Sequence, residues 1–358
     1  MLQPGSPLYD ILDLARWAPS GDNAQPWRFE IVGEHHVVVH GFDTREHCVY
    51  DLDGHASQLA LGALLETLTV AASGHGLRAG IERREGMPET QPTFDVRFSV
   101  DAEIHPDPLL SFITQRTVQR RRMRTALLSP AQKEVLDAAA GSTYSIVWME
   151  GISSKLRAAR LMFDNARIRL TIPEAYAVHR AIIEWNARFS EDKVPDQALG
   201  LDPVTLRLMR WVMASWGRVE FFNTFLAGTL APRIQLDFIP GLACAAHFAL
   251  VAKTPPITLD DYVMAGRAVQ RFWLTATRLG LKLQPEMTPV IFGRYVREGK
   301  SFTRSSRARE SAAALTGRLS RLLGVEPLQR VVFLGRIGFG PSPSSRSLRL
   351  ALPKLLRS

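Results

Sequence analysis

The chain has 358 residues, of which 46% are hydrophobic and 22% are charged, a composition that fits a folded protein and excludes extensive disorder. The net charge of +9 favours an anionic partner such as a nucleic acid, a membrane surface or a phosphorylated cofactor. The two cysteines, Cys48 and Cys244, exclude a disulfide framework and a cysteine-based zinc site, so we expect reduced thiols.

The sequence shows no sign of secretion or membrane insertion. The first ten residues, MLQPGSPLYD, have neither a basic nor an apolar leader region. The most apolar run, residues 241–252, is too short to cross a bilayer and is predicted to form a buried helix. We therefore expect a cytoplasmic protein without a membrane span.

The first third of the chain is predicted to alternate helices and strands. Apolar spacing after a serine predicts a helix over 7–17, and residues 27–33 and 35–42 are predicted strands joined by a turn. A strongly apolar helix over 57–77 ends at Gly74 and Gly76, and an alternating strand over 93–100 follows. The proline-containing residues 103–110 are a predicted connector, and we place a boundary after residue 108.

The remainder is predicted to be richer in helix. Ser129 caps a helix whose first residue is Pro130, and a strand follows at 144–150. Residues 297–326 are charged and poorly patterned. Further helices are predicted over 152–170, 172–185, 204–230 and 257–281, and a last strand over 329–340. The apolar helices ending at residues 77 and 281 both close with Gly-Leu, which suggests related halves; such helices resemble one another easily, so this alone leaves the question open.

Two phosphate-binding motifs are excluded by spacing. Residues 293–301 have one residue too many between Gly293 and Gly299 for a phosphate loop. The glycines of residues 335–340 are in the wrong order for a dinucleotide fingerprint, and Pro341 stands where a helix would have to begin.

A basic segment is the strongest remaining chemical feature. Residues 115–124 hold five arginines together with Thr117. The run fits a solvated surface, a nucleic-acid patch, or a phosphate held by arginine and a threonine hydroxyl. No aromatic platform or DNA-binding motif accompanies it, so nucleic acid is the weakest of the three.

Residues 15–27, ARWAPSGDNAQPW, resemble the Ala-Pro-Ser-x-x-Asn-x-Gln-Pro-Trp loop of the FMN-dependent nitroreductase family. Arg116 and Thr117 resemble part of that family's phosphate-binding segment, although Gln115 and Gln119 stand where the family has arginine. Residues 284–287, Gln-Pro-Glu-Met, and the closing segment with Arg346 and Arg349 are also similar to family segments. The resemblance implies an α+β nitroreductase-like fold with mostly antiparallel central sheets flanked by helices.

The order of these segments is unusual, because the loop precedes the arginines. The resemblance therefore implies two related halves, 1–108 and 109–358, fused as an intrachain pseudo-dimer similar to the Acg-like and MoeY-like subgroup. The first half carries the loop, and the second carries the arginine segment, a helical lid-like insertion and the C-terminal strand. The second loop position, GST at 141–143, lacks the motif. We expect one FMN per chain, in a monomer or a homodimer of pseudo-dimers.

The resemblance implies a flavin enzyme that takes hydride from NAD(P)H and passes it to a flat, electron-poor or conjugated small molecule, without a catalytic protein residue, metal or nucleic acid. A non-catalytic flavin-binding or flavin-sequestering protein is the alternative. Trp211, Trp216 and Phe222 are expected to line the substrate pocket, or else to pack in a core or a subunit contact. The implied cofactor-binding residues are Pro19, Ser20, Asn23, Gln25, Arg116, Thr117, Arg120, Pro285, Glu286, Met287, Arg346 and Arg349.

Overall fold

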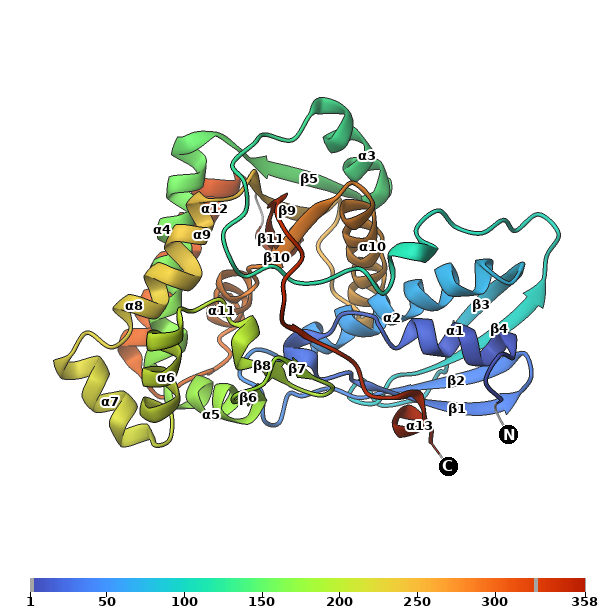
Figure 1. Ribbon diagram of the computed structural model, residues 1–358, viewed down its shortest axis with the longest axis horizontal. Helices are drawn as coiled ribbons and strands as arrows, with labels where there is room; N and C mark the ends of the chain where they lie inside the picture. The colour runs from blue at the N-terminus through green and yellow to red at the C-terminus, as the bar shows by residue number, and fades with distance from the viewer. Residues whose placement is uncertain (1–2, 325–327, 358) are drawn as a thin grey trace.

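The structure is a computed structural model that describes residues 3–324 and 328–357. It has the expected α+β architecture, with two four-stranded antiparallel sheets and helices packed against them (Figure 1). The first sheet has the strand order β1-β2-β4-β3. Its elements are α1 (Pro7–Ala15), η1 (Gly21–Asn23), β1 (Trp27–Gly33), β2 (His36–Gly41), α2 (His55–Ser73), β3 (Leu77–Arg83) and β4 (Thr93–Val100).

The second sheet is assembled from strands that are far apart in the sequence, in the order β5-β9-β11-β10. A short turn, η2 (Leu110–Phe112), precedes it, and η5 (Leu328–Arg330) leads into its β11 strand. Its elements are α3 (Pro130–Ala140), β5 (Tyr144–Met149), β9 (Ala246–Ala252), α10 (Leu259–Arg278), β10 (Leu281–Pro285), α11 (Thr288–Arg297), α12 (Ser306–Leu323) and β11 (Val331–Phe339).

The two sheets share one topology. In each, a helix leads into two strands, a long helix follows, and two further strands complete the sheet, with the fourth strand inserted between the second and the third. The long helices α2 and α10 occupy equivalent places in this order.

Helices α2 and α10 join the two sheets by packing directly on each other (Figure 1). A glycine from each helix stands at their closest approach. A Cβ atom on Gly62 would lie 1.9 Å from the Val263 carbonyl oxygen, and one on Gly266 would lie 2.1 Å from the Leu59 carbonyl oxygen. The crossing therefore requires glycine at both positions.

An insertion of residues 150–243 separates β5 from β9 and forms the left-hand lobe of the molecule (Figure 1). It is mainly helical, with three very short strands. Its elements are α4 (Gly151–Thr171), α5 (Pro173–Ile182), β6 (Ile183–Glu184), β7 (Phe189–Ser190), β8 (Val194–Pro195), η3 (Asp196–Ala198), α6 (Pro203–Val212), α7 (Trp216–Phe225), α8 (Leu230–Arg233), the π-helix η4 (Ile234–Phe238) and α9 (Ile239–Leu242).

Two segments cross between the sheets. Leu109 and Ile113 pack in the core beneath the first sheet, although the sequence assigns residues 109–358 to the second half. At the other end, β12 (Arg346–Ser347) pairs with β7, and α13 (Leu352–Leu355) packs beside β1 (Figure 1). Leu352 and Leu355 are buried in the first core, so the last residues of the chain complete it.

Three sequence expectations about secondary structure are wrong. The apolar run at 241–252 is largely the strand β9 rather than a helix. It lies between β5 and β11 with both faces covered, since Phe248 and Leu250 enter one core and Ala249 and Val251 enter another. A strand buried on both faces shows no polar alternation, so a short apolar run gives no period by which to tell it from a helix.

The other two errors concern helices. The helix predicted over 204–230 is broken at Met213–Ser215, where the Ser215 hydroxyl accepts from the Arg218 amide and starts α7. Residues 297–326, expected to be poorly patterned, contain the helix α12. Residues 325 and 326 lie outside the described residues. The buried stripe of α12 begins with two alanines and continues through Leu315 and Leu319, so its apolar period is weak in the sequence.

Among the described residues, α2 is the one helix whose length and mean hydropathy, 1.2, would suit a membrane span. Of its most apolar 18-residue window, 83% is buried inside the protein, and the helix packs against the first sheet, α1 and α10. Its apolar character is therefore that of a core helix.

Candidate functional site

The loop that follows α1 is held in a strained conformation. Asp22, Asn23 and Gln25 have φ angles of 51°, 64° and 48°, in the left-handed region that non-glycine residues rarely adopt. Such residues cost on the order of 1 kcal/mol each and persist where surrounding contacts impose them. The Ser20 hydroxyl oxygen provides one of these contacts, since it accepts from the Gln25 amide at 3.0 Å.

Gln25 fastens the loop to two distant parts of the chain. Its side-chain amide donates to the Glu191 carbonyl at 2.9 Å and to the Asn23 carbonyl at 3.1 Å. Its side-chain oxygen accepts from the Leu350 amide at 2.9 Å. The buried Gln25 side chain is thus engaged at both ends and acts on the shape of the loop.

Asn23 keeps one polar atom unengaged. Its side-chain nitrogen donates to the carbonyls of Glu191 and Lys193, at 3.1 and 3.2 Å. Its Oδ1 atom is buried and has no hydrogen-bond partner in the described part of the chain. An orphaned buried acceptor is uncommon in proteins and marks a place for a donor from a ligand or a water molecule.

Three of the predicted arginines converge on this loop from distant segments. Arg116 donates to the Trp17 carbonyl at 2.8 Å and stacks on the Trp273 ring. Arg349 donates to the Ala18 carbonyl at 3.0 Å, and Arg346 lies over the Trp17 ring, 4.9 Å from its centroid. We refer to Arg116, Arg346 and Arg349 as the arginine cluster.

The arginine cluster carries positive charge without a compensating carboxylate. Burial, and then Arg349 and Arg346, hold the pKa of Arg116 well below its ordinary value. Burial, followed by Arg346 and Arg16, lowers the pKa of Arg349 to about 9. Among residues 3–324 and 328–357, no acidic side chain forms an ion pair with the cluster, and the Nε atoms of Arg116 and Arg346 are buried without partners. Unpaired buried donors beside repelling cations form a site for an anion.

Arg120 and Thr117 lie on the same segment but outside the cluster. Arg120 is half-buried near Asp22; burial raises the pKa of this aspartate, and Arg120 opposes that rise. Thr117 is half-buried between the two arginines. The segment runs beside β10, where the Gln119 amide donates to the Leu283 carbonyl at 3.0 Å. Only part of the basic run at 115–124 is therefore an exposed face.

Glu286 belongs to a second, ionic group at the end of β10. Its carboxylate accepts from His247 Nδ1 at 2.7 Å and from Arg336 at 2.9 Å. Burial acts to lower the pKa of His247, but Glu286 and a hydrogen bond with Cys244 outweigh it and raise that pKa to about 10. His247, Glu286 and Arg336 form a buried ionic network, and Arg336 reaches the predicted segment by donating to the Arg120 carbonyl at 2.8 Å.

The resemblance implies that backbone amides near Glu286 and Met287 face the reactive nitrogen of the flavin, and the structure changes this expectation for Glu286. The Glu286 amide donates to the Leu334 carbonyl at 2.8 Å, so it is occupied within the protein. The Met287 sulfur in turn accepts from the Leu334 amide at 3.3 Å, and the side chain packs between two cores. Pro285 ends β10 and pairs with Gly335.

The three aromatic residues predicted for a substrate pocket are not gathered at the arginine cluster. Trp211 lies on α6, and Trp216 and Phe222 lie on α7, in the left-hand lobe of the molecule (Figure 1). Trp211 is 52% exposed and packs edge-on against Phe222, while Trp216 packs on Tyr176. Their further contacts are with Arg218 and Phe221 of α7, so the group packs within the insertion.

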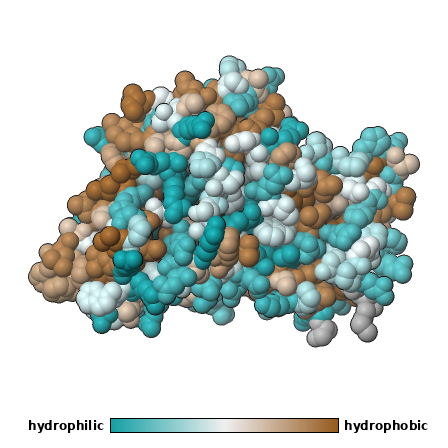
Figure 2. All heavy atoms as spheres, viewed as in Figure 1, coloured by the Kyte–Doolittle hydropathy of each residue, from teal (hydrophilic) through white to brown (hydrophobic). Residues whose placement is uncertain are grey.

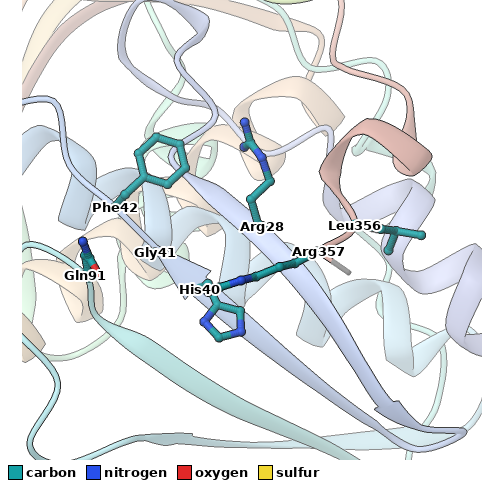
Figure 3. Close-up of a pocket in the computed structure, with 7 residues that line it drawn as sticks. All are labelled: Arg28, His40, Gly41, Phe42, Gln91, Leu356 and Arg357. Carbon is teal, nitrogen blue, oxygen red and sulfur yellow. The ribbon is translucent and has the colours of Figure 1, made fainter.

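Two surface hollows lie apart from these groups. The first, of about 430 Å³, is lined by residues of β1, β2 and the chain end, including Arg28, Phe42 and Arg357 (Figure 3). The second, of about 620 Å³, lies in the insertion and is lined mainly by apolar residues such as Phe163 and Phe238. Neither hollow is lined by a predicted site residue.

Several residues that shape the site were not found by sequence reasoning. Arg336 lies inside the strand β11, whose glycines fit no dinucleotide fingerprint, and His247 lies in the apolar run at 241–252, which the sequence predicts as a buried helix. Glu191 and Lys193 contribute only backbone carbonyls, which no side-chain motif reveals. A charged residue within an otherwise apolar predicted strand, as at Arg336, was the one available signal.

Comparisons with known proteins return few relatives. No family model matches the chain. The chain is 24% identical over 298 residues to "Uncharacterized protein MT1398" of Mycobacterium tuberculosis (strain CDC 1551 / Oshkosh), a match that covers 80% of this chain and 39% of that protein. The chain thus spans well under half the length of this curated relative. Among solved structures, it is similar to a nitroreductase-like family protein from Bacillus cereus, with 12% identity, a TM-score of 0.34, and coverage of 70% of this chain and 96% of that one.

Proposed function

We propose that this protein is an FMN-dependent NAD(P)H oxidoreductase of the nitroreductase type, which reduces a flat, electron-poor or conjugated small molecule. The observation that carries the proposal is the arginine cluster: three arginines, two of them buried, with no carboxylate partner in the described part of the chain, set against a strained loop that resembles a flavin-binding loop. The proposed site includes no metal and no catalytic side chain.

The arginine cluster suits the phosphate of FMN. A phosphate monoester carries about −1.5 to −2 charges at neutral pH and three strong acceptor oxygens. The unpartnered Nε atoms of Arg116 and Arg346 are donors of the kind that such oxygens accept. Arg349 adds a third positive charge, and its position is fixed by the Ala18 carbonyl. The phosphate would neutralise charges that now repel one another.

The loop offers complementary groups for the remainder of the cofactor. Asn23 Oδ1 is a buried acceptor without a partner, and the Ser20 hydroxyl lies on the same loop. Bound FMN would supply the hydride transfer between nicotinamide and acceptor. The protein would position the cofactor through Gln25 and Asn23, and Arg120, Thr117 and residues 285–287 would complete the wall on the side of the second sheet.

We further propose that the chain is a fused pseudo-dimer, with halves near 1–108 and 109–358. The shared strand order of the two sheets and the paired glycines of the α2–α10 crossing support this. The loop comes from one half, whereas Arg116, Arg346 and Arg349 come from the other. A cytoplasmic location and NAD(P)H as electron donor belong to the same proposal and rest on the sequence resemblance.

The test is a cofactor-retention experiment. Purified protein is mixed with FMN, desalted, and examined by visible absorption before and after NAD(P)H is added without oxygen. We expect a yellow protein that the nicotinamide bleaches, and that an electron-poor quinone or nitroaromatic compound restores to yellow.

The other outcomes separate the alternatives. A protein that stays colourless after desalting contradicts every flavin proposal. The basic segment would then be a nucleic-acid patch or a solvated surface. A yellow protein that neither NADH nor NADPH bleaches contradicts the oxidoreductase and identifies a flavin-binding or flavin-sequestering protein, the alternative that the occupied Glu286 amide favours.

A further inference from the structure

The insertion exposes an unusual number of large apolar side chains. Over a stretch of 36 residues, eight such side chains are exposed, among them Phe225 at 71%, Phe221 at 53% and Trp211 at 52%. Figure 2 shows hydrophobic residues gathered over this lobe. We refer to these eight residues as the apolar patch: Val204, Leu208, Trp211, Phe221, Phe225, Leu226, Leu230 and Ile239.

The patch follows from helical spacing. On α6, Val204, Leu208 and Trp211 are separated by four and three residues and therefore lie on one face. On α7, Phe221 and Phe225 are separated by four residues and their rings pack 5.2 Å apart. Helix α6 thus turns an apolar stripe outward, and α7 adds two exposed aromatic rings, where an ordinary surface helix carries polar residues. Contiguous exposed apolar surface of this kind marks an interaction site.

Exposed positive charges outnumber exposed negative charges around the patch. Arg207, Arg210 and Arg218 are exposed on the same two helices, against the exposed acidic residues Asp202 and Glu220. The Asp202 carboxylate is engaged as the N-cap of α6, where it accepts from the amides of Val204 and Thr205. Arg218 lies 4.5 Å above the Trp211 ring, so a cation stands directly at the edge of the apolar surface. The whole chain adds a net charge of +9.

An apolar hollow adjoins the patch. It has a volume of about 620 Å³ and is lined by Phe163, Ile234, Phe238 and Ile239, with Arg160 and Asp164 as its charged members. Ile239 belongs to both the patch and the hollow, which makes the two surfaces continuous. Because its lining is mainly apolar, a recess of this kind suits an acyl chain.

From these features we propose that helices α6 and α7 bind the surface of an anionic lipid membrane. Helices that combine Trp, Phe and Leu with flanking arginines lie in the interface of a bilayer, with the apolar side chains among the acyl chains and the cations at the headgroups. Charge decides between this partner and a second copy of the chain. A symmetric dimer through the patch would oppose the arginines of one copy to those of the other, whereas acidic lipids pair with them.

The proposal is tested by co-sedimentation with lipid vesicles. The full-length protein is centrifuged with vesicles of phosphatidylcholine alone and with vesicles that contain one third phosphatidylglycerol. We expect binding to the anionic vesicles that weakens as salt is raised from 50 to 500 mM, because salt screens the arginine–phosphate attraction. The double variant Phe221→Ser/Phe225→Ser should bind about tenfold more weakly, since each ring loses its burial among acyl chains.

Matched variants separate the patch from general surface effects. Val100→Ser removes another highly exposed apolar side chain, far from the patch in the first sheet, and should leave binding unchanged. Arg207→Gln/Arg218→Gln should weaken binding to anionic vesicles severalfold, whereas Arg278→Gln, a single exposed arginine at the end of α10, should not. Leu208→Ser repeats the test on α6 if the double variant unfolds at a lower temperature than the parent.

Three results would overturn the proposal. The first is that the parent does not sediment with anionic vesicles, and the second is that the parent and the phenylalanine variant bind equally. The third is that the parent forms a dimer, the phenylalanine variant does not, and vesicles bind neither form. The last result, measured by sedimentation velocity, would assign the patch to self-association. Because no flavin takes part, none of these results depends on the proposed oxidoreductase activity.

Discussion

At the scale of single residues, the arginine cluster lowers the stability of the ligand-free protein but favours the binding of an anion. Within the residues that the structure describes, Arg116 has one hydrogen bond, a stacked Trp273 ring and two repelling arginines, but no counter-ion. Replacing Arg116 with Met removes a buried unpaired cation and leaves an apolar side chain of similar length. We therefore expect the ligand-free variant to unfold at the same temperature as the parent or a few degrees higher.

The same Arg116→Met substitution should weaken FMN by roughly 10- to 100-fold, because a charge-assisted hydrogen bond to phosphate is lost. Flavin fluorescence titration measures the affinity, and thermal unfolding with and without FMN measures the linked stabilisation. The control is Arg122→Met, which removes an exposed arginine from the same basic run. Equal affinity of the Arg116 variant and the parent would remove Arg116 from the phosphate site.

The half-buried His179 and the buried His247 have opposite effects on the dependence of stability on pH. Burial, and then Arg169, lowers the pKa of His179 to about 3, so this neutral ring stabilises the fold above pH 6.5 and that contribution is lost as pH falls toward 3. The pKa of His247 is raised to about 10, so its contribution is present below pH 6.5 and is lost as pH rises toward 10.

The loss of stability through His179 at acid pH gives a measurable prediction. Between pH 7.5 and pH 4.5, protonation of His179 should lower the free energy of unfolding of the parent by about 3 kcal/mol. In the His179→Gln variant, the decrease between the two pH values should be smaller by about this amount. Urea denaturation at the two pH values measures both, and the exposed His75→Gln serves as the control. An unchanged pH dependence in the His179 variant would mean that this ring is protonated without cost in the folded protein.

At the scale of elements, the α2–α10 crossing depends on two glycines. Gly62→Ala would place a methyl group 1.9 Å from the Val263 carbonyl oxygen, on backbone that has no room to move away. We expect a loss of about 3 kcal/mol or more in the free energy of unfolding. Gly217→Ala in α7 is the matched control, since a Cβ there meets nothing within 4 Å; it should stabilise by about 0.5 to 1 kcal/mol. Equal unfolding midpoints for the two variants would show that the helices separate easily.

The same scale shows what the sequence predicts well. Elements with a cap or a clear period were predicted well: α3 begins after its predicted cap Ser129, and the amphipathic α10 lies within the predicted range 257–281. The strand β9 and the helix α12 were missed because local sequence does not say that a strand will be covered on both faces or that alanines will be buried. Arg116 and Arg349 contact the carbonyls of Trp17 and Ala18, and their role in a flavin site stays a prediction. The His247–Glu286–Arg336 network depends on contacts between distant strands and has no local pattern.

At the scale of the whole molecule, each sheet depends on segments from elsewhere in the chain. The final residues cross back to the first sheet, where the Arg357 amide donates to the Phe29 carbonyl at 2.7 Å and Leu355 is fully buried. The same tail delivers Arg346 and Arg349 to the loop. Folding of the first core and assembly of the proposed phosphate site therefore require the same stretch of chain.

This arrangement predicts the number of cofactors. The position equivalent to residues 16–26 in the second sheet is the short turn at 141–143 between α3 and β5, and it has no Asn-x-Gln-Pro-Trp sequence. The segment after β4 likewise lacks a counterpart of the arginine tail, since residues 101–109 include no arginine. A second flavin site would therefore have neither the loop nor the cations, although the strand order of its half is the same.

We expect one FMN per chain at saturation. Equilibrium dialysis against FMN, with protein determined by amino-acid analysis, measures this ratio directly. Removal of residues 345–358 should abolish binding and also destabilise the first core, whereas the double variant Arg346→Gln/Arg349→Gln should abolish binding and leave Leu352 and Leu355 in place. A ratio of two would mean that the second sheet forms a complete site of its own. Retention of FMN by the double variant would mean that the cofactor lies elsewhere on the molecule.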